Sequence, residues 1–257
     1  MFGIPQVLAF GGTDSCGGGG LSADQRAVRD GGGHLFGIVT AVTAQGPAGV
    51  VSVIPVPVKG IWDQAEALLK EGLRSGAVKC GMLVNAVIVS AAAEIITKYS
   101  LPNLVLDPVI LSTSGRSLLD DEGVKILKQR LLPLAALVTP NIPEAEWLTG
   151  VQIRREDDMR RAIFILMEHG ARAVLLKGGH ATGDEVTDIL YDGTGFQHHL
   201  HRRLPGNPRG TGCTLASAIS VRLAGGMELT TAVFQSLDYM QQVISAAADI
   251  GGVTVLT

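Results

Sequence analysis

A regular alternation of short apolar segments with longer segments of helical spacing constrains the fold of this chain more than any other feature. Apolar runs at residues 7–10, 104–106 and 173–176 have the length and composition of buried strands. Parallel strands need long crossover connections, which helices usually supply, and few hairpin signals interrupt the alternation. The pattern therefore predicts an α/β fold with a mainly parallel sheet covered by helices on both faces.

The predicted strands and helices follow one another along the whole chain. Strands are predicted at residues 7–10, 35–43, 50–58, 77–81, 104–106, 136–139, 173–176, 188–191 and 196–201. Helices are predicted at residues 21–30, 61–73, 85–99, 120–131, 144–148, 157–169, from about 212, and 228–250 with a candidate break near Ser236. No boundary rich in proline, serine or charge divides this order, so residues 1–257 are expected to form one domain.

Composition and charge exclude several classes of protein. Hydrophobic residues make up 46% of the 257 residues and charged residues 18%, which supports a sizeable core. A formal net charge of −3 without a basic stripe argues against nucleic-acid binding. No segment has the length and apolar character of a membrane span, and the N-terminus lacks the pattern of a signal peptide. The three cysteines, Cys16, Cys80 and Cys213, form no CxxC pair, which argues against disulfides or a zinc site and favours a cytoplasmic location.

Polar and small residues gather at the carboxyl ends of the predicted strands. They are Gly12, Asp14, Gln45, Met82, Asp107, Asn141, Lys177 and Cys213. Ligands of open parallel sheets bind beyond these ends of the strands. We therefore expect one ligand site, built from segments that lie far apart in the sequence.

The segment at residues 204–226 carries the strongest single indication of chemistry. Arg209 is followed by the motif Gly-Thr-Gly-Cys at residues 210–213, after which the spacing becomes helical. A glycine-rich helix entry offers free backbone N–H groups and a partial positive charge, which suit a phosphate. The same field is expected to lower the pKa of the Cys213 thiol and to favour a thiolate base. The alternative is a simple turn with a small buried cysteine.

A second glycine-rich loop, residues 17–20, lies between the first predicted strand and the first predicted helix. This order is similar to a dinucleotide-binding opening, although the GxGxxG spacing is not distinctive within a run of glycines. A flexible turn is the alternative. Ordering four consecutive glycines costs much conformational entropy, however, which favours a loop that lets a ligand approach the backbone closely. Asp24 follows on the helix, where acidic residues usually have a structural role.

Four polar side chains at the strand ends have both a chemical and a structural interpretation. Asn141 and Glu144 lie three residues apart at a helix start, where they suit Mg²⁺ held through water, or a helix cap with a surface acid. Lys177 precedes a glycine pair and suits a phosphate, or is a lysine at a strand end before a turn. Asp107 precedes a proline and is either a buried charge near a metal or the cap of a turn.

Three histidines, His198, His199 and His201, lie close together in one predicted strand. Alternation places His199 and His201 on one face of that strand. Since no acid or thiol is near them in sequence, a metal site is not expected there.

Eight groups of residues, distributed over nearly the whole chain, form an ordered set of motifs. They are Gly12-Thr13-Asp14 with residues 17–20 and Ala23-Asp24; Thr43-Ala44-Gln45; Lys79-Cys80-Gly81-Met82-Leu83; Leu106-Asp107-Pro108-Val109; Ser114-Gly115 with Leu118-Leu119; residues 139–145; Leu176-Lys177-Gly178-Gly179-His180; and Gly210-Thr211-Gly212-Cys213-Thr214. The set resembles the hydroxymethylpyrimidine/phosphomethylpyrimidine kinase family of thiamin biosynthesis. Cys213 is the most telling residue, because most relatives of this fold carry Asp there. The resemblance implies a ribokinase-like three-layer αβα sandwich with a mainly parallel central sheet, and ATP and Mg²⁺ as cofactors.

The resemblance also implies a reaction and a role for most of these residues. It implies ATP-dependent phosphorylation of 4-amino-5-hydroxymethyl-2-methylpyrimidine, and then of the monophosphate to the diphosphate. The implied pyrimidine pocket consists of Gln45, whose amide would pair with the aminopyrimidine edge, and of Gly12, Asp24, Met82 and Val109. The implied nucleotide and phosphate contacts are Lys177, Thr211, Asn141 and Glu144, and the magnesium candidates are Asp107 and Glu144. Cys213 would take the proton from the hydroxymethyl group or orient it, while Gly210 and Gly212 hold the γ-phosphate.

The chain departs from the family pattern in four places. It has Ser15 and Cys16 where the family often has Pro and Ser, and Arg209 where the family usually has His. Leu237 stands where a family lysine is expected, and the glycine-rich C-terminal tail is reduced to Gly251-Gly252. These changes bear on the nucleotide side and on the second phosphorylation.

Two alternative functions follow from the same residues. A pyridoxine or pyridoxal kinase would share the fold, and Cys213 does not exclude it. A pyrimidine-binding sensor without catalysis is the alternative from another class, supported only by Arg209 and Leu237. By analogy with the fold, a homodimer is expected.

Overall fold

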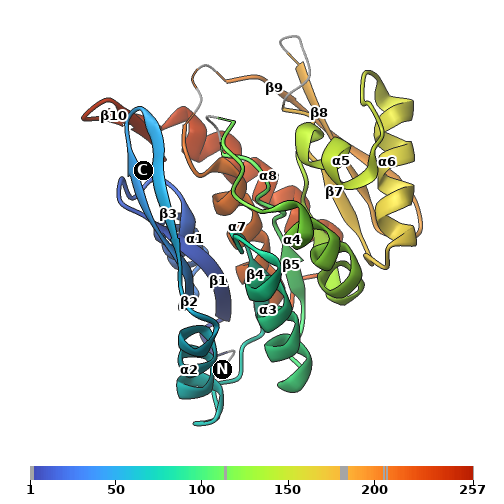
Figure 1. Cartoon of the computed structure of the whole chain (residues 1–257). Coiled ribbons are helices and arrows are strands. Elements are labelled where there is room, and N and C mark those ends of the chain that lie inside the picture. Colours follow the sequence, from blue (N-terminus) through green and yellow to red (C-terminus); the bar gives the residue numbers. More distant parts are fainter. Residues whose placement is uncertain (1–2, 113–114, 180–184, 205, 207, 257) are drawn as a thin grey trace.

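A mostly parallel sheet forms the centre of the computed structural model, which describes residues 3–112, 115–179, 185–204, 206 and 208–256 (Figure 1). Within these residues the strand order is β3-β2-β1-β4-β5-β6-β7-β8-β9. The strands are β1 (Gln6–Asp14), β2 (His34–Gly46), β3 (Gly49–Pro55), β4 (Ala77–Cys80), β5 (Leu104–Leu106), β6 (Ala135–Val138), β7 (Val174–Leu176), β8 (Glu185–Tyr191) and β9 (Phe196–Arg202). The pairs from β2 through β7 are parallel, whereas β3, β8 and β9 add antiparallel edges. The predicted mainly parallel sheet is confirmed.

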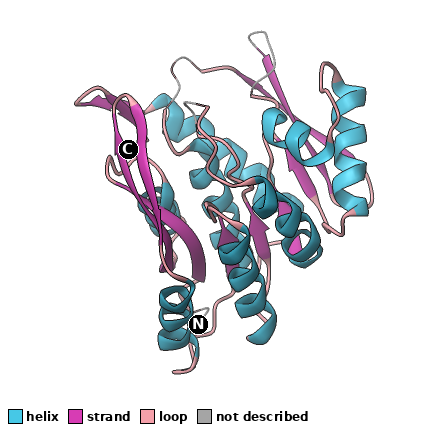
Figure 2. Cartoon of the chain, viewed as in Figure 1, coloured by secondary structure: helices cyan, strands magenta, loops and turns pink. Residues whose placement is uncertain are grey.

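Helices cover both faces of the sheet (Figure 2). The helices are α1 (Gly20–Asp30), α2 (Val58–Leu69), α3 (Ala86–Lys98), α4 (Asp121–Ile126), α5 (Ile142–Thr149), α6 (Glu156–Glu168), α7 (Thr211–Ala224) and α8 (Leu229–Ser245). Buried side chains of α2 to α6 share one hydrophobic cluster with the sheet, whereas α7 and α8 form a second, and α1 joins α7 in a third. This arrangement is the three-layer αβα sandwich that the resemblance implied.

The local sequence accounts for the ends of several elements. The central strand β1 is buried on both faces, which matches its unbroken apolar run from Val7 to Phe10. Asn85 caps α3 as predicted, since its side-chain oxygen accepts a hydrogen bond from the Ile88 N–H at 3.0 Å. No helix among the described residues is long and apolar enough to cross a membrane.

The C-terminal region differs from the predicted helix at residues 228–250. Helix α8 continues past Ser236, whose hydroxyl donates to the Ala232 carbonyl at 2.7 Å and so needs no break in the helix. After Ser245 the chain instead forms a two-stranded antiparallel sheet of β10 (Ala248–Ile250) and β11 (Val253–Val255). The Gly251-Gly252 turn has positive φ angles at both residues, which suits a tight hairpin. Figure 1 shows β10 beside the tip of the β2–β3 hairpin.

Two further boundaries also differ from those predicted. The segment predicted as one helix at residues 120–131 is α4 followed by a π-helical stretch, Leu127–Leu131. Gln45, predicted on a turn at a strand end, lies within β2 and pairs with Val50 of β3. Predictions that rest on Thr113, Ser114, His180, Pro205 or Asn207 lie outside the described residues.

Candidate active site

A cavity of about 530 Å³ opens at the carboxyl ends of the parallel strands. Every site residue proposed from the sequence lines this cavity except Asp24. They are Gly12, Gln45, Met82, Asp107, Val109, Asn141, Glu144, Lys177, Gly210, Thr211, Gly212 and Cys213. The fold thus brings together segments that are up to 201 residues apart in the sequence, as expected for strand ends in such a sheet.

A second cavity of about 500 Å³ adjoins the first. It is walled by β8, β9 and α8, and it includes Leu237, His201 and Gln241. The two cavities share Asn141, Lys177, Thr211 and Gly212. Two ligands, one in each cavity, would therefore meet at a wall that carries an ammonium group and the start of α7.

The start of α7 lies at this shared wall and has the backbone of an anion site. Gly210 has a φ of +80°, and a Cβ there would lie 2.1 Å from the Gly18 carbonyl oxygen, so only glycine fits. The two glycine-rich loops therefore pack backbone against backbone. The Gly210 carbonyl oxygen accepts the first hydrogen bond of the helix from the Thr214 N–H, at 2.8 Å. The preceding N–H groups of the first turn are left for a ligand.

Asp14 orders the other glycine loop, which the sequence left open as a flexible turn. One carboxylate oxygen accepts a hydrogen bond from the Cys16 N–H at 2.9 Å, and the other accepts from the Gly19 N–H at 2.7 Å. Asp14 also lines the first cavity. The loop is therefore held in one conformation against the start of α7.

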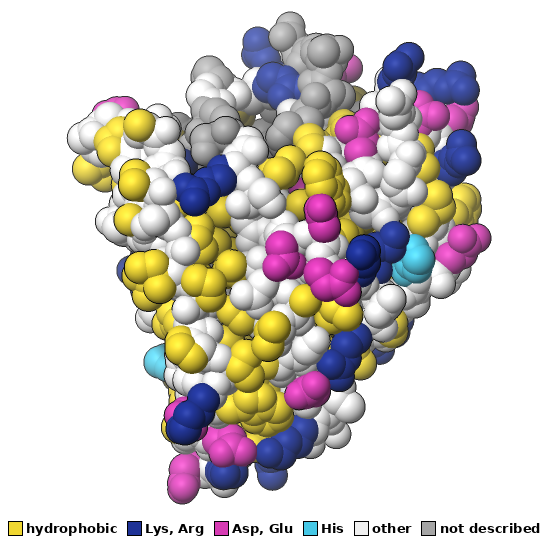
Figure 3. Space-filling view, in the orientation of Figure 1, with side chains coloured by type: hydrophobic (Ala, Val, Ile, Leu, Met, Phe, Trp, Pro, Cys, Tyr) yellow, Lys and Arg dark blue, Asp and Glu magenta, His cyan; other side chains and the backbone are white. Residues whose placement is uncertain are grey.

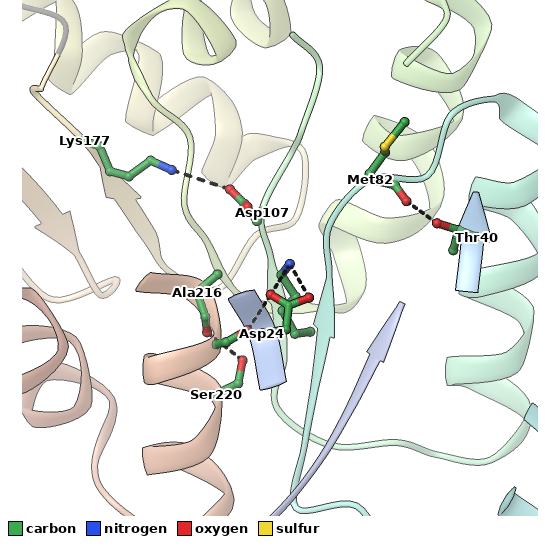
Figure 4. A network of polar contacts seen from close by, with 9 residues as sticks. Asp24, Thr40, Met82, Asp107, Lys177, Ala216 and Ser220 are labelled. Atoms are coloured by element: carbon green, nitrogen blue, oxygen red, sulfur yellow. Dashed lines mark hydrogen bonds and ion pairs between the residues drawn. The ribbon is translucent and has the colours of Figure 1, made fainter. Parts of the chain in front are cut away.

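Three ionisable side chains, Lys177, Asp107 and Glu144, converge at the shared wall. The Lys177 ammonium lies 3.5 Å from Asp107 Oδ1, as Figure 4 shows. Asn141 and Glu144 form a capping box at the start of α5, with reciprocal hydrogen bonds of 2.9 Å, so the predicted helix cap is confirmed, whereas the surface position predicted for the acid is wrong. Glu144 is nevertheless buried and lines the cavity. Burial raises the pKa of Glu144 to about 8, opposed by Lys177 and reinforced by Asp107.

Cys213 lies in the first turn of α7, but its ionisation differs from the expectation. Burial raises the pKa of the Cys213 thiol to about 12. The ammonium of Lys79 opposes this rise, whereas the carboxylates of Asp107 and Asp24 reinforce it. The predicted thiolate was wrong, because the loss of solvent and the nearby negative charges outweigh the field of the helix. At neutral pH the group is a thiol.

Asp24 lies beneath the cavity and not on its surface. Its side chain is fully buried and accepts hydrogen bonds from Lys79 Nζ at 2.9 and 3.1 Å and from the Ser217 hydroxyl at 2.8 Å (Figure 4). Lys79 lines the first cavity although its side chain is only 1% exposed. Burial alone would lower the pKa of Lys79, but the charge of Asp24 raises it, so the lysine stays protonated. Sequence reasoning missed Lys79, whose signal was a lone lysine inside an apolar strand.

Two of the four departures from the family pattern, Arg209 and Leu237, line different cavities. Arg209 lines the first cavity, and its Nη2 donates to the carbonyl oxygens of Gly46 and Pro47 at 2.8 and 2.9 Å. The guanidinium thereby ties the start of α7 to the tip of the β2–β3 hairpin. Leu237 is buried on α8, where it lines the second cavity with an apolar surface.

An αβα sandwich with two adjoining cavities that meet at a glycine-bounded helix start is the architecture of a small-molecule kinase of the ribokinase-like fold. The family model described as phosphomethylpyrimidine kinase matches residues 14–256 of this chain. The chain belongs to the phosphomethylpyrimidine kinase family.

Curated relatives support this assignment. The chain is 38% identical over 252 residues to the hydroxymethylpyrimidine/phosphomethylpyrimidine kinase of Bacillus subtilis, covering 96% of this chain and 92% of that protein. It is 43% identical over 246 residues to the thiamine biosynthesis bifunctional protein ThiED of Geobacter sulfurreducens. That match covers 95% of this chain and spans half the length of the bifunctional protein.

Solved structures show the same fold. The phosphomethylpyrimidine kinase of Clostridium difficile matches with a TM-score of 0.83 and 39% identity, over 94% of this chain and all of that chain. An ADP complex of Bacillus subtilis pyridoxal kinase matches with a TM-score of 0.90 and 27% identity, over 99% of this chain and 98% of that chain. The fold is therefore shared by kinases of two different rings.

Proposed function

We propose that this kinase phosphorylates 4-amino-5-hydroxymethyl-2-methylpyrimidine with ATP, and then phosphorylates the monophosphate to the diphosphate. The observation that carries the proposal is the pair of adjoining cavities with a shared wall of Asn141, Lys177, Thr211 and Gly212. The acceptor ring occupies the first cavity and the nucleoside occupies the second. The phosphoryl group passes between them at the shared wall. The identity of the acceptor ring, a pyrimidine, is inferred from the names of the relatives.

The first cavity supplies groups that suit an aminopyrimidine. Gln45 offers an amide that donates and accepts hydrogen bonds, as the amino group and ring nitrogen of the pyrimidine require. Met82 and Val109 line the same cavity and supply apolar contacts to the ring, while Gly12 lets the ring approach the backbone. A Cβ at Gly12 would lie 3.0 Å from the Met82 sulfur, so this wall is already closely packed. Asp24 supports the cavity from below, through Lys79.

The shared wall supplies positioning and charge, which carry most of the catalysis of phosphoryl transfer. The Lys177 ammonium and the free N–H groups at the start of α7 bind the γ-phosphate and neutralise its charge. Cys213 lies in the same turn as a thiol and orients the hydroxymethyl oxygen toward phosphorus. As this oxygen bonds to the γ-phosphorus, the bond between that phosphorus and the bridging oxygen of ADP breaks, and the hydroxyl proton passes to an oxygen of the transferred phosphoryl group. In the second step the attacking oxygen belongs to a phosphate and is already anionic, so this step depends less on Cys213.

Replacement of Cys213 by alanine should therefore separate the two steps. We expect kcat of the first phosphorylation to fall by about 10²-fold, because the hydroxyl loses its partner, and kcat of the second to fall much less. The measurement is initial-rate kinetics with each pyrimidine as the starting substrate. The Cys16→Ser variant serves as a thiol control outside the cavity lining. Equal losses in both steps would contradict a role specific to the hydroxymethyl group.

Two carboxylates beside the anion site suit Mg²⁺. Asp107 and Glu144 line the first cavity and present oxygen donors, which magnesium prefers. Burial, reinforced by the charge of Asp107, raises the pKa of Glu144, and a bound cation would favour its ionised form. We propose that these residues hold Mg²⁺ through water, and the ion would neutralise charge on the phosphates of ATP.

The raised pKa of Glu144 gives this proposal a pH dependence. Below about pH 8 the protonated form of Glu144 predominates, and a proton must leave before the carboxylate can serve a cation. The apparent affinity for Mg²⁺ should therefore rise by up to about tenfold per pH unit between pH 6 and 8, and level off above. Mg²⁺ titrations of activity at fixed ATP measure this. Glu144→Gln should bind Mg²⁺ more weakly and lack the slope; a wild-type affinity that is flat over this range would contradict the role of Glu144.

A pyridoxine or pyridoxal kinase is the second candidate function, favoured by the TM-score of 0.90 to a pyridoxal kinase. The 38% identity to a pyrimidine kinase, against 27% to the pyridoxal kinase, favours the pyrimidine. An assay in which hydroxymethylpyrimidine and pyridoxine compete for a limiting amount of enzyme, with both products quantified, distinguishes the two functions. We expect kcat/KM to favour hydroxymethylpyrimidine; a preference for pyridoxine would reverse the assignment. The sensor alternative is set aside, because the chain belongs to a kinase family.

We further propose a homodimer that forms through the exposed face of the β2–β3 hairpin. Val42 and Ile54 pair directly across this hairpin, and they are 48% and 61% exposed. Figure 3 shows hydrophobic side chains gathered on the side of the molecule where these strands lie. Ile54→Asp should convert a dimer into a monomer in sedimentation velocity, whereas Val87→Asp on α3 should not. A wild-type monomer at micromolar concentration would contradict the proposal.

A cytoplasmic location is proposed from the cysteines. Cys16, Cys80 and Cys213 are all free, and Cys80 is buried in the core. A chain that keeps three free thiols suits a reducing compartment.

A further inference from the structure

The hairpin of β8 and β9 brings together three side chains with metal-binding chemistry. Asp188 and His199 face each other directly in the antiparallel register, and His201 follows two residues later on the same face. One donor atom from each of the three lies within 4.8 Å of the others. The strand pairing thus supplies the acid that the sequence around the histidines lacks.

Each of the three side chains is also held from its far side. Asp188 Oδ1 accepts a hydrogen bond from the Gly178 N–H at 2.7 Å, which leaves Oδ2 beside His201 Nε2 at 3.2 Å. His201 Nδ1 lies 2.9 Å from the Gln241 side-chain amide. His199 Nε2 lies 3.2 Å from Asp238 Oδ1. Carboxylates and amides placed in this way fix the ring orientation of metal-binding histidines and raise their basicity.

One nitrogen of the cluster has no partner among the described residues. His199 Nδ1 is buried and accepts or donates no hydrogen bond there. A buried polar atom without a partner is costly, and native structures usually explain it by an ion or a water. Because Asp238 Oδ1 accepts a hydrogen bond from the Nε2–H of His199, the neutral tautomer leaves the lone pair of Nδ1 available for a metal.

We propose that Asp188, His199 and His201 bind a divalent transition-metal ion of the zinc type. The ligand atoms are Asp188 Oδ2, His199 Nδ1 and His201 Nε2. Two imidazoles and one carboxylate form a donor set that Zn²⁺ accepts, with a fourth position left for water or another ligand. On binding, the ion replaces the hydrogen bond between Asp188 and His201, and the Gln241 amide turns its oxygen to the Nδ1–H of His201.

The ion would act on the nucleotide side of the kinase. Asp188 and His201 line the second cavity, and Asp188 holds the Gly178 N–H, next to Lys177. This consequence rests on the proposed function, but the metal site itself does not. The test of the site is therefore made without nucleotide or pyrimidine.

The experiment is a titration of the full chain, without a histidine tag and freed of metal by a chelator, with Zn²⁺ by calorimetry and with Co²⁺ by absorption. We expect one ion per chain and a cobalt spectrum with nitrogen and oxygen ligands only. His199→Ala and His201→Ala should each weaken binding by more than about 100-fold. Asp238→Ala, a change at a side chain that is 69% exposed, should weaken it by about 10–100-fold without affecting the fold. His198→Ala is the matched control, because His198 pairs with Glu156 outside the cluster.

Three results would overturn the proposal. They are the absence of stoichiometric binding by the wild type, equal binding by the wild type and the His199→Ala and Asp238→Ala variants, and a sulfur-to-cobalt charge-transfer band. The last would place the ion on a cysteine. Circular dichroism of each variant confirms that the fold is retained, and Asp238→Ala decides the outcome if a histidine variant does not fold.

Discussion

Replacement of Lys177 by methionine should lower kcat by about 10²–10³-fold while the protein remains folded. Lys177 is a positive side chain that lines both cavities, and its ammonium lies 3.5 Å from Asp107 Oδ1. The substitution removes the charge that would neutralise the transferred phosphoryl group. It also removes the ammonium that lies beside Asp107. Steady-state ADP release with saturating substrates measures the loss.

A matched substitution on the surface separates this effect from a general loss of charge. Lys59 on α2 is 84% exposed and pairs with Asp63, far from the proposed site in the fold. Lys59→Met should keep wild-type kcat, because exposed ion pairs contribute little. A Lys177→Met enzyme that turns over within a few-fold of the wild type would show that the phosphoryl group does not pass the shared wall.

Replacement of Lys79 by methionine should lower the free energy of unfolding by about 3–5 kcal/mol. Lys79 and Asp24 are 1% and 0% exposed, and their ion pair of 2.9 Å joins β4 to α1. Without Lys79, the buried carboxyl of Asp24 must be neutral in the folded state, although it ionises above about its usual pKa of 3.8 in the unfolded state. Folding then takes up a proton, so the stability of the variant falls as the pH rises. Urea unfolding at pH 5 and pH 8 should show the larger deficit at pH 8.

A second substitution should rescue this deficit. The double variant Lys79→Met with Asp24→Asn carries no buried charge at this position, and an amide can still bond with Ser217. We expect the double variant to recover most of the lost stability, with a coupling energy that a double-mutant cycle resolves. A Lys79→Met protein as stable as the wild type at pH 8 would mean that the ion pair contributes nothing to the fold.

The sheet and the site positions were predictable because they follow from patterns of local sequence. Apolar runs that end in polar residues placed Asp107 and Lys177 at strand ends, and a parallel sheet brings such ends to one edge. The glycine motif at residues 210–213 likewise predicted the helix start that the structure shows, with Gly210 as its N-cap. These features can be predicted from the hydrophobic periodicity of the sequence and from the conformation that a glycine-rich turn allows.

The remaining features depend on distances that the sequence does not contain. The ionisation of Cys213 is set by burial and by Asp107 and Asp24, which are 106 and 189 residues away in the chain. Asp24, the partner of Lys79, lies 55 residues away in the chain. The sequence therefore shows only an isolated lysine in an apolar strand and does not reveal the ion pair. The antiparallel register of β8 and β9 places Asp188 opposite His199, 11 residues away in the chain. Electrostatic environments of this kind follow from the packing of the fold, and local propensity does not reveal them.

The most direct test of the proposed activity is the mass of the product that the wild-type chain forms from hydroxymethylpyrimidine and Mg²⁺-ATP, with ADP release followed in parallel. The proposed function predicts that two phosphoryl groups are added in succession, and that the pyrimidine diphosphate accumulates as two ADP are released per ring. A reaction in which no phosphorylated pyrimidine appears, with or without turnover of pyridoxine, would contradict the proposed function. A product that stops at the monophosphate would contradict its second step.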